Sequence, residues 1–172
     1  MYYRTRTYIA GDWDGDSDAI EQIHKWNEGD RWSLSFSDAH DLMQARDPSL
    51  NCSIKKSLSE RLNASKRFVL IVGSGTNSRR AGMCRYCKQD SNCQYKSNWH
   101  ENLSFIEYEC YRAYKLYSEG KIDVVVLYNA TICDKKRCPP TLREIGTHVA
   151  MKEYVNYRTQ WSYEAVKKAL QN

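Results

Sequence analysis

The sequence lacks any apolar run that approaches the roughly 20 residues needed to span a bilayer. It opens with Met1-Tyr2-Tyr3-Arg4 and leads directly into a strand-like segment, so it lacks the form of a secretory signal peptide. Long polar tracts are absent too, and 41% apolar with 27% charged residues is a globular composition. We therefore expect a cytoplasmic protein with no membrane partner. Its 172 residues suffice for one domain and are too few for two ordinary ones, so we expect a single domain over residues 1–172.

Seven cysteines occur without a secretion signal, which argues against a disulfide framework and for reduced thiols. Cys84 and Cys87 lie after the third predicted strand, and Cys133 and Cys138 lie after the fourth. Loops at the same end of neighbouring parallel strands emerge side by side, so these four thiolates are candidate ligands of a structural Zn²⁺. The spacing of Cys133 and Cys138 is not that of a standard zinc knuckle, and unligated thiols are the alternative.

The net charge is +5, and much of the excess falls within residues 79–96. A basic stretch of this kind suits an anionic ligand such as a nucleotide or a nucleic acid. A solvated basic loop is the simpler interpretation, and we do not expect a nucleic-acid partner.

Strand-like and helical segments alternate along the chain. The strand-like segments are residues 6–10, 32–36, 68–72, 122–128 and 148–151, and the helical ones begin near residues 17, 53, 99 and 163. The unbroken β-branched run at 68–72 is typical of a buried strand in a parallel sheet. This alternation predicts an α/β fold with a flavodoxin-like, doubly wound, five-stranded parallel sheet and helices on both faces. Such sheets bind ligands at the carboxyl ends of their strands.

Glu109 falls where the helical period of its segment calls for an apolar residue. One line of that helix contains Phe105, Glu109, Ala113 and Leu116, while Glu107 points towards solvent. A buried carboxylate is costly unless it is paired, hydrogen-bonded or put to chemical use. Glu109 is therefore a candidate catalytic group, and a glutamate satisfied by a backbone amide or an arginine is the structural alternative.

Two turns lie at the predicted ligand-binding edge of the sheet. Gly73-Ser74-Gly75-Thr76 offers amides and hydroxyls to an anion, but it lacks the P-loop lysine and the dinucleotide-fingerprint spacing. Asp12, Asp14 and Asp16 alternate around Trp13 without the spacing of an EF-hand. We expect this second turn to form a wall of the pocket rather than a cation site.

Four motifs follow one another in the sequence: Ile9-Ala10-Gly11-Asp12-Trp13-Asp14, Phe68-Val69-Leu70-Ile71-Val72-Gly73-Ser74-Gly75-Thr76, Phe105-Ile106-Glu107-Tyr108-Glu109 and Gly120-Lys121-Ile122. This ordered set resembles the TIR-like family, specifically the small bacterial branch associated with Thoeris antiphage defence, over roughly residues 6–130. The chain departs from the family pattern in two places. Phe105 replaces a tryptophan, and residues 77–98 form a cysteine-bearing insertion that the family does not require.

The resemblance implies an NAD⁺-processing enzyme of the NAD⁺ nucleosidase or ADP-ribosyl cyclase type. Such relatives cleave the nicotinamide–ribose bond and make an ADP-ribose-type signal, which is hydrolysed, cyclised or transferred and reaches a downstream effector by diffusion. Glu109 matches the essential glutamate of these relatives. The nucleotide pocket would be lined by Asp12, Trp13, Ser74, Thr76 and Phe105, with Asp38 a further candidate. A non-catalytic TIR-like module that binds a protein or a nucleotide is the alternative, and the sequence also leaves a homo-oligomer open.

Overall fold

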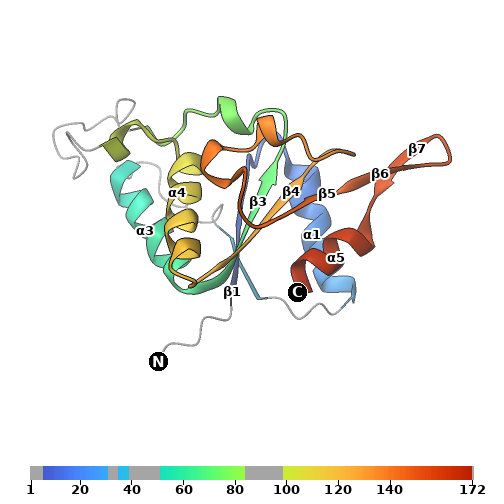
Figure 1. Ribbon diagram of the computed structural model, residues 1–172, viewed down its shortest axis with the longest axis horizontal. Coiled ribbons are helices and arrows are strands. Elements are labelled where there is room, and N and C mark those ends of the chain that lie inside the picture. Colours follow the sequence, from blue (N-terminus) through green and yellow to red (C-terminus); the bar gives the residue numbers. More distant parts are fainter. Residues whose placement is uncertain (1–5, 31–34, 39–50, 84–98, 172) are drawn as a thin grey trace.

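The structure is a computed structural model that describes residues 6–30, 35–38, 51–83 and 99–171 (Figure 1). Its strands form a parallel sheet of order β2-β1-β3-β4-β5, which is the flavodoxin-like order. The strands are β1 (Arg6–Ala10), β2 (Ser35–Asp38), β3 (Ser65–Val72), β4 (Asp123–Tyr128) and β5 (Thr147–Ala150). The predicted α/β class is confirmed.

Helices cover both faces of the sheet, as the alternation of elements predicts (Figure 1). Residues of α3 (Asn51–Asn63) and α4 (Phe105–Ser118) pack on one face, and residues of α1 (Ser17–Asp30) and α5 (Tyr163–Gln171) pack on the other. Successive residues of β3 supply the two cores in turn, because side chains of a strand alternate between its faces. The central strands are therefore apolar throughout. Among the described residues no helix combines the length and the apolar character needed to cross a membrane.

A hairpin follows β5 that the sequence patterns do not predict. Its strands β6 (Lys152–Val155) and β7 (Arg158–Trp161) pair antiparallel and form a separate two-stranded sheet. Asn156 and Tyr157 connect them with positive φ angles of 48° and 62°. Positive φ at both central residues is the signature of a type I′ turn, whose usual sequence is Asn-Gly rather than Asn-Tyr.

The long helix begins later than its predicted start near residue 99. Trp99–Asn102 form a 3-10 turn, η4, and α4 starts at Phe105 because Ser104 caps it. The Ser104 hydroxyl accepts a hydrogen bond from the Glu107 amide at 3.2 Å, and the Glu107 carboxylate accepts one from the Ser104 amide at 2.7 Å. Glu107 is predicted to point towards solvent, but this capping box engages its carboxylate and leaves the residue half-buried.

We expect Ser104→Ala to lower the free energy of unfolding by about 1 kcal/mol, because it removes the acceptor for the Glu107 amide. Urea denaturation of the parent and the variant measures this difference. Glu107→Gln serves as the comparison, since glutamine also closes a capping box and should cost less. A loss for Ser104→Ala no larger than that for Glu107→Gln would contradict this account.

Candidate functional site

The loops after β1, β3 and β4 meet at the carboxyl edge of the sheet and bury two carboxylates there. Asp12 and Asp16 are only 5% and 3% exposed. Asp12 accepts hydrogen bonds from the backbone amides of Asp14 and Gly15 at 3.3 and 3.2 Å. It also forms an ion pair with Arg79 at 2.6 Å. The hydrogen bond that Arg79 donates within this pair raises the pKa of its guanidinium. The pair ties the loop after β1 to the loop after β3.

Asp16 is connected to the end of β4. The Asn129 side-chain amide donates to Asp16 Oδ1 and to Asp18 Oδ1, both at 2.9 Å. The second oxygen of Asp16, Oδ2, is buried and has no hydrogen-bond partner among the residues that the structure describes. Burial raises the pKa of Asp16, and the hydrogen bond from Asn129 opposes that shift. Asp18, the more exposed of the two carboxylates that Asn129 binds, forms an ion pair with Lys152 at 3.2 Å.

Glycines make room for both carboxylates. A Cβ atom on Gly73 would lie 2.0 Å from Asp16 Oδ1, and one on Gly15 would lie 2.5 Å from Asp12 Oδ2. At either position a side chain would force the neighbouring carboxylate to move. The glycines of these turns therefore serve the close approach of backbone to carboxylate, which is a structural reason for part of the Gly73-Ser74-Gly75-Thr76 motif.

The residues predicted to line the nucleotide pocket differ in their surroundings. Thr76 is buried, and its hydroxyl accepts a hydrogen bond from the Gly73 amide at 2.9 Å, which closes the turn. Ser74 is exposed at the edge. Trp13 packs against the core on the α1 and α5 face. Phe105 is half-buried against the core on the α3 and α4 face, where it abuts Gly82. The backbone of Asp38 pairs with β1, and its side chain lies outside the part of the chain that the structure describes.

Glu109 faces inward, as its helical position predicts, and is 5% exposed. The Tyr8 hydroxyl of β1 donates a hydrogen bond to Glu109 Oε1. Tyr8 in turn stacks on Phe68 of β3, with ring centroids 5.8 Å apart. Tyr8 belongs to the core between the sheet and α3 and α4, so Glu109 and Trp13 contact opposite faces of the sheet.

Lys55 is a buried charged residue near this site that the sequence patterns did not single out. Its Nζ donates to the His100 carbonyl at 2.8 Å and lies 5.8 Å from the centroid of the Tyr108 ring. Helical periodicity identifies Lys55 in the same way as Glu109. Lys55 lies beside Ile54 in the apolar stripe of α3, and Glu109 lies in the apolar stripe of α4. Burial lowers the pKa of His100, and the Lys55 charge adds to that shift.

The proposed zinc ligands are divided between described and undescribed residues. Cys84 and Cys87 lie outside the described residues. Cys133 is exposed, whereas Cys138 is fully buried, and burial raises the pKa of the Cys138 thiol to about 11. Within the described ranges no group of three or more His, Cys, Asp or Glu side chains is placed to hold a metal ion. Zinc binding by the four cysteines stays a prediction.

A comparison with protein families matches residues 8–82 to the family described as Thoeris protein ThsB, TIR-like domain. The match confirms the resemblance to TIR-like proteins of the Thoeris type and supports a TIR-type role in antiphage signalling. It spans less than half of the chain and ends before α4, so it includes Asp12 and Thr76 but not Glu109. No curated protein matches the chain.

We expect Gly73→Ala to destabilise the protein by about 1–3 kcal/mol, because the new methyl group would overlap the buried Asp16 carboxylate. Gly29→Ala is the matched control. A Cβ on Gly29 meets no atom within 4 Å, and alanine favours the helix by roughly 0.5–1 kcal/mol. Thermal unfolding measures both variants. Equal stability of the two would show that the loops have room at Gly73.

We expect Asp16→Asn to be more stable than the parent at pH 7. A raised pKa means that folded Asp16 binds its proton more tightly than unfolded Asp16, so the parent loses stability as pH rises from 3.8 through the raised pKa. The advantage of the variant should therefore shrink as pH falls through that window. Urea denaturation between pH 4 and 7 measures the difference. Asp14→Asn is the control, since the Asp14 side chain is 89% exposed, and a similar gain there would contradict the role of burial.

Proposed function

We propose that this chain is an NAD⁺-processing TIR-like enzyme in which Glu109 is the catalytic carboxylate. It would cleave the nicotinamide–ribose bond and release an ADP-ribose-type signal during antiphage defence. One observation carries the proposal: the carboxylate is buried in α4 and held from β1 by the Tyr8 hydroxyl. The residue that helical periodicity selects as anomalous is also the one that the family resemblance selects as catalytic.

The chemistry fits a carboxylate in this setting. When the bond between the ribose C1′ and the nicotinamide nitrogen breaks, its electron pair leaves with nicotinamide, which departs as a neutral molecule. The ribose gains oxocarbenium character, which a nearby carboxylate stabilises electrostatically. Attack by water at C1′ then yields ADP-ribose and a proton, whereas attack by another nucleophile yields a cyclised or transferred product.

Tyr8 supports this role as a positioning residue. Its hydroxyl holds Glu109 Oε1, and its ring is fixed by stacking on Phe68, so the carboxylate has a set orientation before substrate arrives. A preorganised carboxylate avoids reorganisation at the moment when charge develops.

The residues of the proposed nucleotide pocket fall into two groups, those that contact the nucleotide and those that shape the turns around it. We propose that exposed Ser74 and half-buried Phe105 contact the nucleotide directly. Asp12 and Thr76 act by shaping the two turns, since Asp12 pairs with Arg79 and Thr76 closes the turn after β3. Trp13 supports the first turn from the α1 and α5 face.

A non-catalytic TIR-like module is the second candidate, and the same hydrogen bond favours it. Tyr8 and Glu109 are 101 residues apart in sequence, so their bond ties α4 to β1 and gives the buried glutamate a structural role. In that case Glu109 would matter for stability alone, and the chain would bind a protein or a nucleotide without changing it.

Nicotinamide release separates the two candidates. We expect Glu109→Gln to lower release from NAD⁺ by at least about 100-fold, since the variant keeps the shape of the side chain and removes its charge. The assay uses purified protein and, in parallel, phage-infected cells that express it, so that an infection-dependent trigger is present.

Glu107→Gln is the matched control, because it makes the same change two residues away and keeps an acceptor for the cap. Urea denaturation of both variants shows whether each is folded. Release that survives in folded Glu109→Gln would refute the catalytic role. Absence of release by the parent in both settings would favour the non-catalytic module.

A further inference from the structure

The loops after β3 and β4 gather basic side chains at the carboxyl edge of the sheet. These residues are Arg79 and Arg80 in the first loop and Lys135, Lys136, Arg137 and Arg143 in the second. The two loops lie side by side (Figure 1), and the Asn77 side chain joins them by donating to the Lys136 carbonyl at 2.8 Å. The packing of the loops therefore brings cations from two distant parts of the chain into one region.

Half of these cations are already neutralised by carboxylates. Their ion pairs are Arg79–Asp12 at 2.6 Å, Lys135–Glu144 at 3.2 Å and Arg137–Asp134 at 3.4 Å. Among residues 6–30, 35–38, 51–83 and 99–171, no carboxylate forms an ion pair with Arg80, Lys136 or Arg143. We call these three residues the basic ridge, and they retain a positive charge without an internal counterion.

Backbone carbonyls orient the two guanidiniums of the basic ridge. Arg80 Nη1 donates to the Asn77 carbonyl at 3.0 Å. Arg143 Nε donates to the Cys138 carbonyl at 2.8 Å, and its Nη2 donates to the Lys136 carbonyl at 3.3 Å. A carbonyl carries no net charge, so these bonds fix each guanidinium without neutralising it. Nη2 of Arg80 and Nη1 of Arg143 keep their hydrogens for the acceptor atoms of a ligand.

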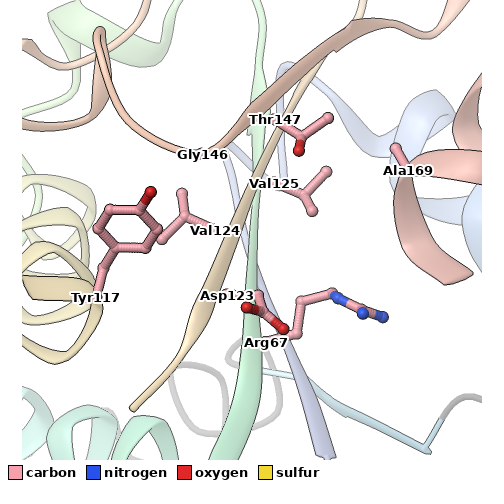
Figure 2. Close-up of a pocket in the computed structure, with 8 residues that line it drawn as sticks. All are labelled: Arg67, Tyr117, Asp123, Val124, Val125, Gly146, Thr147 and Ala169. Carbon is pink, nitrogen blue, oxygen red and sulfur yellow. The ribbon is translucent and has the colours of Figure 1, made fainter. Parts of the chain in front are cut away.

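A cavity of about 370 Å³ at the amino edge of the sheet also contains an arginine, but in a different setting (Figure 2). Arg67 lines this cavity together with Asp123, its register partner in the β3–β4 pairing. The Arg67 guanidinium also donates to the Leu170 carbonyl near the end of α5. A nearby carboxylate and the negative end of a helix both compensate a cation, so this cavity suits an anion less well than the basic ridge does.

We propose that the basic ridge binds the diphosphate group of a nucleotide. Guanidiniums bind phosphate oxygens through paired hydrogen bonds, and a lysine adds a compact positive charge. A diphosphate carries a negative charge on each phosphate, which matches a ridge with several uncompensated cations. Arg79, the neighbour of Arg80 in sequence, pairs with Asp12, so the ridge adjoins the candidate nucleotide pocket. The inference rests on the nucleotide ligand of the proposed function, but it does not require cleavage of that nucleotide.

A nucleic acid is the competing anion for a basic surface. Proteins with strongly salt-dependent binding to DNA make about 6–10 phosphate contacts, each with its own cation or hydrogen-bond donor. The basic ridge has only Arg80, Lys136 and Arg143, because the neighbouring cations are paired with carboxylates. A ligand with few phosphates therefore fits this surface better than a polynucleotide.

Isothermal titration calorimetry of the full chain with ADP-ribose tests the basic ridge. ADP-ribose carries the diphosphate and lacks the bond that the proposed enzyme would cleave. We expect Arg80→Gln and Arg143→Gln each to weaken binding at least about tenfold, because each removes charged hydrogen bonds to phosphate. Lys136→Gln should weaken binding about threefold or more, and it spares the loop, since the Lys136 side chain forms no hydrogen bond with a described residue.

Arg137→Gln is the matched control. It changes the net charge by the same amount in the same loop, but the cation that it removes is already paired with Asp134. We expect its affinity for ADP-ribose to stay within about twofold of that of the parent. Circular dichroism confirms that each variant is folded. Equal weakening by Arg137→Gln and the three ridge variants would show that net charge alone matters, and it would overturn the site.

Three further ligands identify the group that is bound. Adenosine, which lacks phosphate, should bind the parent and the ridge variants alike, and inorganic pyrophosphate should compete with ADP-ribose but bind more weakly. Pyrophosphate that binds as tightly as ADP-ribose would overturn the assignment to a nucleotide. A DNA duplex that binds more tightly than ADP-ribose would overturn it in favour of a nucleic acid.

The outcome for the basic ridge is separable from the outcome for Glu109. A parent that binds ADP-ribose through the ridge but releases no nicotinamide would support the ridge and count against the enzyme. A parent that releases nicotinamide while the ridge variants bind ADP-ribose as tightly as it does would support the enzyme and overturn the ridge.

Discussion

Buried carboxylates need partners, and this requirement determines how the loops and α4 sit on the sheet. Asp12 is matched by Arg79 from the loop after β3, Asp16 by Asn129 from the end of β4, and Glu109 by Tyr8 of β1. Each bond joins elements that are far apart in sequence, by 113 residues for Asp16 and 101 for Glu109. Removing one partner would leave a charge in a poorly solvated place, so each pair restricts its two elements to one relative position.

The glycines at the carboxyl edge are the steric counterpart of this electrostatic constraint. Because a Cβ on Gly73 would overlap Asp16, the loop after β3 can carry a side chain there only if the Asp16 carboxylate moves. Tight contact between loops keeps their backbone in one conformation, and a rigid edge positions exposed groups such as Ser74 more accurately than a loose one. The acidic first turn therefore has a clear structural role, with Asp12 and Asp16 turned inward and Asp14 left at the surface.

Much of the fold can be predicted from the sequence, because strands buried on both faces must be apolar throughout, as residues 68–72 are. The inward position of Glu109 is predictable for a similar reason, since a helix has a fixed period. Its partner is not predictable, because Tyr8 meets Glu109 only through the packing of α4 on β1. The β6–β7 hairpin escapes sequence analysis since its turn is Asn156-Tyr157 and its strands are mostly polar. The face of the sheet on which Trp13 packs is not predictable, because Trp13 lies in a loop, and a loop has no helical or strand period.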